Sequence, residues 1–510
     1  MAIMADQQRE GPAELHRISV VALALVVGAT VFWTVYPHLT QLNLDAYIDM
    51  LENHAWGIRW QWGNPNHPPL FGWLTAGWFE VFPRTDLSYR LLAALNIGAG
   101  LGLMVLIARR FLTPPEQVAA VMVALVMPPL GFLAFTYNAN SAMLPFWAGT
   151  ILFYLRVIEH RRMADAALLG AFAGAAILSK YFAAVLLLAL LGHALSNRQT
   201  RAIVATPIPV VAAIVFLLVV GPHLLWLFGN GFSSVVFATR KQGDASIVAL
   251  MRSQIEFLIA QPLYALPGLA ILGLLRRPDD GAPWFDRRAI AAAFGSTRGK
   301  VLLWAGLATV PLTMALALAL QVPLTSNWSL PIFSVVPILL TLLLPRPVAE
   351  RMRGWTIGLS VGFMVLMLAL SPLIRGQILE RAHANNALPL RALAEASGTL
   401  WTESVNDDIA FVAGHRFYAM AASFYLPSRP HFLEGPDIAR QPWAQGETLT
   451  RSGVLVICGW PAETCIEPWQ SDANWRVEPL GTAEVPAVPG AGGPPSYTLL
   501  AFRAVYASGW

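Results

Sequence analysis

The feature that most constrains this chain is a succession of long apolar segments. With a window of about 19 residues, hydropathy predicts about eleven membrane spans. Their approximate bounds are 18–36, 87–108, 116–135, 141–158, 164–178, 182–196, 202–227, 256–275, 301–321, 329–345 and 355–374. Since about 20 apolar residues in a helix cross a bilayer, we expect an all-α polytopic membrane module. The composition agrees, because 13% of the 510 residues are charged, whereas soluble domains carry about 25%.

Basic residues between these segments indicate how the chain is oriented. They form clusters at Arg109-Arg110, Arg161-Arg162, Arg198 with Arg201, Arg276-Arg277 through Lys300, and Arg346 with Arg351 and Arg353. If every cluster is cytoplasmic, as the positive-inside rule predicts, the alternation closes. The segment 37–86, the turns near Asn138 and Lys180, the loop 228–255 and the tail after Arg375 are then expected outside.

The tail, residues 375–510, has the pattern of a small folded domain. Short runs rich in β-formers at 409–412, 453–458 and 497–502 alternate with a helical stretch at 417–425. We therefore expect a C-terminal α/β domain. The two cysteines of the chain, Cys458 and Cys465, lie in this tail. An oxidising compartment favours a disulfide between them, with two free thiols as the alternative.

The first outer segment is unusually rich in acids and tryptophans for a connecting loop. Asp45, Asp49 and Glu52 have i, i+4, i+7 spacing, which on a helix would put three carboxylates on one face. An amphipathic helix lying on the membrane with a solvated acidic face is the simpler interpretation. The alternative is a catalytic loop in which a carboxylate takes a proton from an attacking hydroxyl.

A phosphate leaving group would need fixed cations beside such a carboxylate. The outer face offers five candidates: Lys180, His67, Arg59, Arg240 and Lys241. Two of the three lysines in the chain lie there, against the positive-inside trend. Each also has a simpler explanation, since a lysine can snorkel at a helix end and an Arg-Lys pair can contact lipid headgroups. The net charge of +4 is dispersed without a basic, aromatic-interleaved stretch, so we expect no nucleic-acid partner.

Several motifs in family order resemble the bacterial ArnT-like and protein O-mannosyltransferase-like glycosyltransferases of the GT-C fold, of glycosyltransferase family 39 or 83 type. The motifs are Asp49 through Glu52, Trp62-Gly63, His67-Pro68-Pro69-Leu70, Trp73, Asn140 to Trp147, Ser179-Lys180-Tyr181, Phe424-Tyr425-Leu426-Pro427 and Arg429-Pro430. The resemblance spans nearly the whole chain. The run WGIRWQWG and the NAN triplet also resemble the branch that transfers galacturonic acid to lipopolysaccharide.

The resemblance assigns roles to particular residues. The spacing to Trp62-Gly63 puts the family's essential aspartate on Asp49, which implies the catalytic base, and Lys180 and His67 would contact the donor phosphate. Asn140 stands where many members carry another aspartate, and Met50 follows Asp49 where many have a second acid. Four residues are candidates for substrate contact: Glu52, Asp45, Asn140 and Tyr181. The family implies no nucleotide and no essential metal; a divalent metal remains open, although no tight ligand spacing is present.

The expected protein thus has a GT-C transmembrane module at 1–374, a catalytic first periplasmic loop at 37–86 and a periplasmic α/β domain at 375–510. It would sit in a bacterial inner membrane and move a sugar, with inversion, from a polyprenyl-phosphate donor to lipid A or the lipopolysaccharide core. A protein O-mannosyltransferase-like enzyme is the alternative within this class. A lipid-carrier flippase or transporter, and a sensor with an inert membrane part, are alternatives of other classes. The spans are nearly free of Asp, Glu, Lys and Arg, which disfavours a transport pathway.

Overall fold

A computed structural model describes residues 17–64, 66–240, 246–275, 291, 294–343, 350–383, 385–441, 443–444 and 447–507. The chain forms two compact units, which are described separately. The helical unit comprises Met1–Val35, Trp62–Phe71 and Leu91–Leu368. The sheet unit comprises Tyr36–Gln61, Gly72–Arg90 and Ala369–Trp510. The first outer segment is therefore divided between the two units. The sequence predicted a single boundary between the membrane module and the C-terminal domain, at residue 374.

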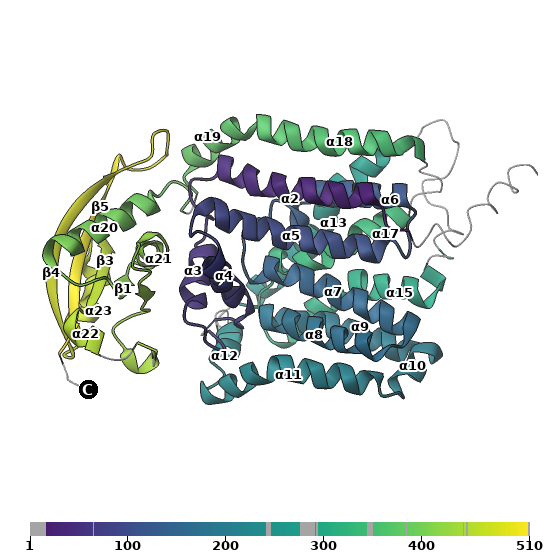
Figure 1. Ribbon diagram of the computed structural model, residues 1–510, viewed down its shortest axis with the longest axis horizontal. Helices are drawn as coiled ribbons and strands as arrows, with labels where there is room; N and C mark the ends of the chain where they lie inside the picture. Colours follow the sequence, from purple (N-terminus) through teal and green to yellow (C-terminus); the bar gives the residue numbers. More distant parts are fainter. Residues whose placement is uncertain are drawn as a thin grey trace, which may run out of the picture. The chain divides into compact units, whose positions relative to one another are not determined.

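Helices of the helical unit run side by side, with α8 packed against both α7 and α11 (Figure 1). The α-helices that lie wholly or mainly in it are α2 (Val20–Thr40), α5 (Asp86–Ala108), α6 (Pro114–Val126), α7 (Ala139–His160), α8 (Met163–Ser179), α9 (Ala184–Ser196), α10 (Arg198–Val204), α11 (Ile208–Gly229), α12 (Ser233–Arg240), α13 (Ile247–Leu275), α15 (Thr297–Leu303), α16 (Thr309–Ala319), α17 (Val336–Leu342) and α18 (Glu350–Ala369). Tighter or wider turns connect some of them: η2 (Pro128–Leu130), η3 (Tyr181–Ala183), η5 (Trp304–Ala308) and η6 (Ser326–Ser334).

The expected count of about eleven spans is not confirmed. Within the described ranges, six helices are long and apolar enough to cross a membrane, or up to eight if each of two bent pairs is one span. The expected span 116–135 stops early, because Pro128 and Pro129 cannot continue α6 beyond Val126. The expected span 329–345 is broken into η6, which contains Pro331, and the short α17.

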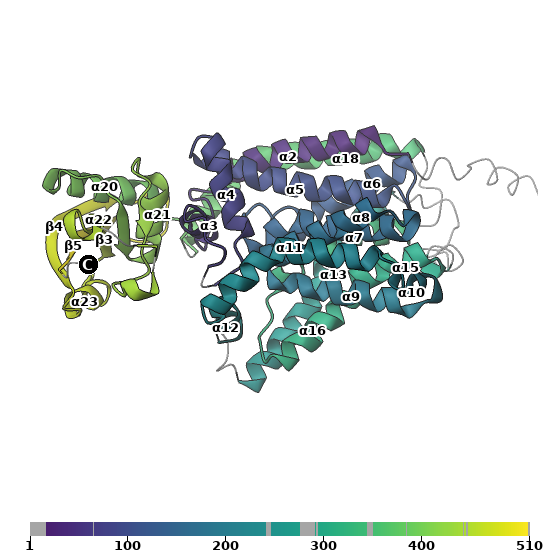
Figure 2. The ribbon, with the colours of Figure 1, turned by 60° about the horizontal axis from the view of Figure 1, so that its bottom comes forward.

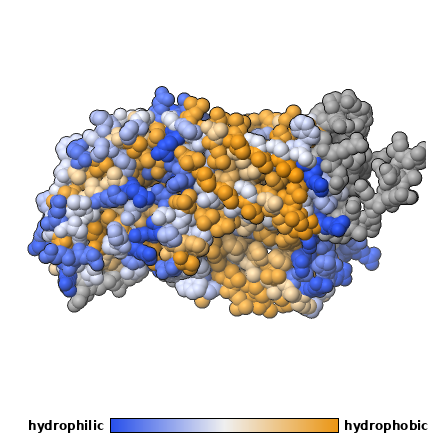
Figure 3. Space-filling model, turned by 45° about the horizontal axis from the view of Figure 1, so that its top comes forward, coloured by the Kyte–Doolittle hydropathy of each residue, from blue (hydrophilic) through white to orange (hydrophobic). Residues whose placement is uncertain are grey.

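Large apolar side chains are exposed on the outward faces of the helical unit, and they gather there in Figure 3. Examples on α11 and α18 are Leu218, Leu225, Phe228, Val365 and Leu366. A helix satisfies its own backbone hydrogen bonds and can therefore present such a surface to lipid. The chain is accordingly a multi-pass membrane protein.

The sheet unit is built from short helices and one mixed sheet. Its elements are α3 (Asp49–Gly57), α4 (Leu70–Val81), α19 (Ser371–Arg381), α20 (Leu390–Ser404), β1 (Phe411–Gly414), α21 (Arg416–Tyr425), β2 (His431–Phe432), η7 (Ile438–Arg440), α22 (Glu447–Arg451), β3 (Val454–Gly459), α23 (Glu463–Ser471), β4 (Trp475–Pro486) and β5 (Ser496–Tyr506). The strand order is β2-β1-β3-β5-β4. β1 is parallel to β2 and β3, whereas β5 is antiparallel to β3 and β4.

Helices cover both faces of this sheet (Figure 2). Val454, Val456 and Cys458 of β3 share one apolar cluster with residues of α22 and α23. Leu455 and Ile457 are also buried, and because side chains alternate along a strand they point to the opposite face. α21 and α20 pack against β1 and β4 respectively. The predicted disulfide is confirmed, since Cys458 and Cys465 are bonded.

Candidate active site

Asp45 does not lie on the helix that the spacing predicts, which corrects the expectation of three carboxylates on one helical face. α3 begins at Asp49, because Ile48 takes a left-handed φ of 83°. The Asp45 carboxylate instead accepts hydrogen bonds from the backbone N–H groups of Tyr47 (2.7 Å), Asp49 (3.1 Å) and Met50 (2.8 Å). Burial and the nearby Asp49 raise the pKa of Asp45 to about 6. Its carboxylate thus orders the start of α3.

Asp49 is held in place by this arrangement. It is the first residue of α3, is partly accessible, and its backbone N–H is fixed by Asp45. Deeper in the same helix, Tyr89 donates its hydroxyl proton to the Met50 carbonyl (2.7 Å). The hydrogen bonds made by Asp45 and Tyr89 fix the backbone that carries the Asp49 carboxylate.

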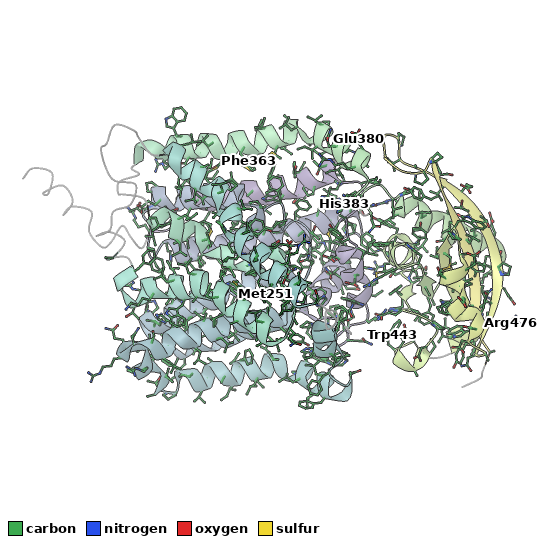
Figure 4. The ribbon with its side chains drawn as sticks, turned by 180° about the vertical axis from the view of Figure 1, so that it is seen from behind. Met251, Phe363, Glu380, His383, Trp443 and Arg476 are labelled. Carbon is green, nitrogen blue, oxygen red and sulfur yellow. A yellow bond between two sulfur atoms is a disulfide. The ribbon has the colours of Figure 1, made fainter. Side chains whose placement is uncertain are left out.

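Glu52 and Arg59 contact residues from the C-terminal part of the sheet unit. Glu52 forms an ion pair with Arg416 at the start of α21. The Arg59 guanidinium donates to the Phe432 carbonyl and stacks on Trp443 at 3.7 Å, a residue labelled in Figure 4. Burial lowers the pKa of Arg59 to about 10. These contacts favour a structural role for Glu52 and Arg59, which hold their segment against C-terminal residues of the same unit. The negative charge of Glu52 is compensated by Arg416.

A group of basic residues surrounds His54 in the sheet unit. Arg84 donates to the carbonyls of Ser423 (3.4 Å) and Leu426 (2.6 Å). Burial, followed by the charges of Arg84, Arg429 and His431, lowers the pKa of His54 to about 3. The imidazole is therefore neutral and packs edge-on against aromatic rings of α4 and α21.

Lys180 and Asn140 are brought together in the helical unit. Asn138 caps α7, and its side chain accepts the Asn140 backbone N–H (2.9 Å). The side-chain oxygen Oδ1 of Asn140 lies 2.6 Å from the Lys180 ammonium, which donates to it. The same ammonium lies 4.8 Å from the centre of the Trp328 ring. An amide and an aromatic face thus orient the lysine.

Tyr181 belongs to a second polar group of the helical unit. Its hydroxyl lies 2.8 Å from His223 Nε2 and 2.7 Å from Ser234 Oγ. His223 Nδ1 lies 2.6 Å from the Trp62 carbonyl oxygen. His223 is 1% exposed and comes from the middle of the apolar helix α11.

The other expected phosphate partners are His67, Arg240 and Lys241. The His67 ring packs against Phe71 and Phe237, with centroids 5.8 and 6.3 Å away. Arg240 is the last residue of α12, and its side chain is outside the described part. Lys241 also lies outside the described residues. The structure thus groups Lys180 with Asn140 and Tyr181 with His223, and separately groups Asp45 with Asp49.

Metal ligands are not clustered in the part of the chain that the structure describes. No three His, Cys, Asp or Glu side chains there could jointly hold an ion. The chemistry available from the described side chains is that of a carboxylate at a helix start and of an oriented ammonium.

His223 is the residue of this region that the sequence interpretation missed. The signal was present, because a histidine interrupts the apolar run VVGPHLLWLFG. A polar side chain within a span is a functional candidate by default, and this applies to a histidine as well as to Asp, Glu, Lys and Arg. Arg416 and Arg84 gave no comparable signal, since their partners are hundreds of residues away in sequence.

Known proteins resemble this chain in both sequence and fold. Residues 66–226 match the family described as dolichyl-phosphate-mannose-protein mannosyltransferase. The lipid A galacturonosyltransferase RgtD of Rhizobium johnstonii is 21% identical over 485 residues, covering 91% of this chain and 98% of the relative. ArnT from Cupriavidus metallidurans bound to undecaprenyl phosphate matches with a TM-score of 0.61 and 13% identity, covering 94% of this chain and 97% of that one. Its apo state matches with a TM-score of 0.59 over the same shares.

These findings agree with one another and with the motifs. The family match contains His67, Asn140, Lys180 and Tyr181, and the fold likeness extends over nearly the whole chain. The chain resembles the ArnT-like GT-C enzymes in sequence and fold, and it is a membrane glycosyltransferase that uses a polyprenyl-linked sugar donor.

Proposed function

We propose that this enzyme moves a sugar from a polyprenyl-phosphate carrier to lipid A or the lipopolysaccharide core on the periplasmic side of the bacterial inner membrane. The reaction would be a single displacement with inversion at the anomeric carbon. The observation that carries the proposal is the Lys180 ammonium, oriented by Asn140 Oδ1 at 2.6 Å and by the Trp328 ring.

Lys180 has the properties that a departing phosphate requires. Its ammonium is held by a neutral amide, and an ammonium attracts the oxygens of a phosphate. Stabilising charge as it develops on a leaving group is the main way such sites accelerate transfer. His67 and the Arg240-Lys241 pair are proposed as secondary contacts to the same phosphate.

Asp49 is proposed as the general base. A hydroxyl that attacks an anomeric carbon must lose its proton, and a carboxylate within hydrogen-bond reach can accept it. Asp49 is partly accessible and sits on a backbone that Asp45 fixes, whereas Asp45 and Glu52 are buried. Among the three acids of this segment, Asp49 is therefore best suited to the role.

The similar proteins support the donor and acceptor classes. The curated relative is named as a lipid A galacturonosyltransferase, and the ArnT structure holds undecaprenyl phosphate. We accordingly propose a polyprenyl-phosphate sugar as donor, with galacturonic acid as the first sugar to test.

Mass spectrometry of lipid A and core from a deletion strain tests this proposal. The expected result is a mass loss equal to one hexuronic acid, one aminopentose or one hexose, restored by the wild-type gene. The size of the loss identifies the donor class. Unchanged lipid A and core in the deletion strain would refute the acceptor class.

One observation favours a second candidate. The family that matches residues 66–226 is described by transfer of mannose to protein. If the enzyme is protein O-mannosyltransferase-like, the deletion strain would have unchanged lipid A and would lack a hexose on an envelope protein. Glycopeptide analysis of the same deletion strain separates the two candidates.

A further inference from the structure

A chain of three hydrogen bonds crosses the helical unit beside Lys180. It runs from Ser234 Oγ to the Tyr181 hydroxyl (2.7 Å), from there to His223 Nε2 (2.8 Å), and from His223 Nδ1 to the Trp62 carbonyl (2.6 Å). Ser234 is 0% and His223 1% exposed. These groups belong to η3, α11, α12 and the loop that precedes α4.

The direction of each bond follows from the partner at the end of the chain. A carbonyl oxygen can only accept, so His223 Nδ1 carries the proton that it donates to Trp62. In a neutral ring Nε2 is then the acceptor, and the Tyr181 hydroxyl donates to it. Tyr181 has used its own proton and accepts one from Ser234. With a neutral His223 ring, one assignment of donors and acceptors satisfies all three hydrogen bonds. The network therefore fixes the geometry of these groups.

Aromatic packing supports the same arrangement. The Tyr181 and His223 rings are stacked with centroids 5.8 Å apart, and His223 is stacked on Trp226 at 5.9 Å. A Cβ atom on Gly63 would lie 2.2 Å from the Trp226 ring. Only glycine therefore allows the loop to come this close to α11, one residue after the carbonyl that His223 binds.

The two segments joined by His223 are those that carry proposed phosphate contacts. Tyr181 directly follows Lys180, and Trp62-Gly63 lie in the same loop as His67. We propose that His223 is a positioning residue that holds these two segments in register, so that Lys180 and His67 meet the donor phosphate together. This inference rests on the proposed function of Lys180 as a phosphate-binding residue. His223 itself makes no contact with the substrate.

Four variants test the role of each ring nitrogen. His223→Asn keeps a donor near the position of Nδ1 and so preserves the bond to Trp62, whereas His223→Gln keeps a polar atom near Nε2 for Tyr181. His223→Phe keeps the ring and removes both bonds, and Tyr181→Phe removes one. We expect His223→Phe to raise KM for the polyprenyl-phosphate sugar about tenfold, as loss of positioned hydrogen bonds does. Its KM for the acceptor is expected to stay unchanged, and the Asn and Gln variants are expected to recover part of the loss.

The chain contains a matched control for the stability effect. His193 of α9 is also buried between a tyrosine and a carbonyl, with Tyr154 Oη at 2.8 Å from Nδ1 and the Thr297 carbonyl at 3.0 Å from Nε2. It carries no proposed donor contact. His193→Phe is expected to lower the melting temperature by an amount similar to that of His223→Phe, with the donor KM unchanged.

A binding measurement separates failure of this inference from failure of the proposed function. Undecaprenyl phosphate is added to each purified variant, and the rise in melting temperature is recorded. A smaller rise for His223→Phe than for His193→Phe, with partial recovery in His223→Asn or His223→Gln, supports the positioning role. Equal rises for the two Phe variants would overturn it, even if the wild type transfers sugar. No rise for the wild type would overturn both the phosphate site and the positioning role.

Discussion

At the scale of single residues, the charge of the partner decides what a half-buried cation can do. Lys180 is oriented by the amide of Asn140 at 2.6 Å, at a position where the resembling enzymes often carry aspartate. An amide is neutral and accepts a hydrogen bond from the ammonium. A carboxylate at the same place would form an ion pair and compete with the donor phosphate.

Asn140→Asp is therefore expected to weaken use of the donor. With a carboxylate at this position, KM for the polyprenyl-phosphate sugar should rise about tenfold, a difference of about 1.4 kcal/mol. Lys180→Ala should raise the donor KM and also lower kcat, because it removes charge from the leaving group. Steady-state kinetics with purified protein measure both. A donor KM for Asn140→Asp equal to that of the wild type would contradict a competition between this carboxylate and the donor phosphate.

His54 makes the sheet unit sensitive to acid. Burial, together with Arg84, Arg429 and His431, lowers the pKa of His54 to about 3, from about 6.5 in an unfolded chain. A histidine whose pKa is lowered by folding contributes to stability at pH values above its pKa in the unfolded chain. This contribution is lost as the pH falls from about 6.5 to 3. His54→Phe is expected to flatten the fall in melting temperature over this window. An unchanged slope would show that His54 is accessible to protons in the folded enzyme.

At the scale of elements, periodicity predicts a helix better than it predicts where the helix begins. The spacing of Asp45, Asp49 and Glu52 indicated one continuous helix, but α3 starts at Asp49 and Asp45 bonds to its first N–H groups. The left-handed conformation of Ile48, which no local propensity favours, determines this start. The partners of Glu52 and Arg59, namely Arg416 and Phe432, depend on chain folding over more than 350 residues and were not predictable locally.

The close approach of α3 and α4 gives a test at this scale. A Cβ on Gly57 would lie 2.1 Å from the Gly72 carbonyl oxygen, a backbone atom that cannot move aside independently. Gly57→Ala is expected to destabilise the sheet unit by about 2–3 kcal/mol, in the range for overpacked sites. Gly77→Ala in α4 is the control, since its Cβ would meet an atom at 3.6 Å, an ordinary contact. Thermal melting compares them, and equal melting temperatures would contradict the close packing of α3 on α4.

At the scale of the whole molecule, hydropathy predicted a membrane protein, and prolines determine where some of the apolar segments end or break. The apolar segments predicted a helical membrane module, and the fold likeness to ArnT agrees with it. The number of spans was not predictable from hydropathy alone, because Pro128-Pro129 and Pro331 shorten or break apolar segments without lowering their average hydropathy much.

The basic clusters predict a membrane orientation that can be tested directly. A reporter that is active only outside should be active when fused after Arg375 and silent when fused after Arg277. The positive-inside rule is the reason, since Arg276-Arg277 begin an expected cytoplasmic loop. An active fusion after Arg277 would contradict the alternation and, with it, a periplasmic reaction.

The central claim is that Asp49 activates the acceptor for attack on a polyprenyl-phosphate sugar. Its most direct test is sugar transfer to lipid A by the purified enzyme, comparing Asp49→Asn with Asp45→Asn after thermal melting has shown that both are folded. Asp49→Asn should reduce transfer roughly 10²-fold or more, because it removes the proton acceptor. Asp45→Asn should mainly cost about 1 kcal/mol of stability, as loss of a helix cap does, and should keep most of the transfer. A folded Asp49→Asn enzyme with full activity would contradict the claim.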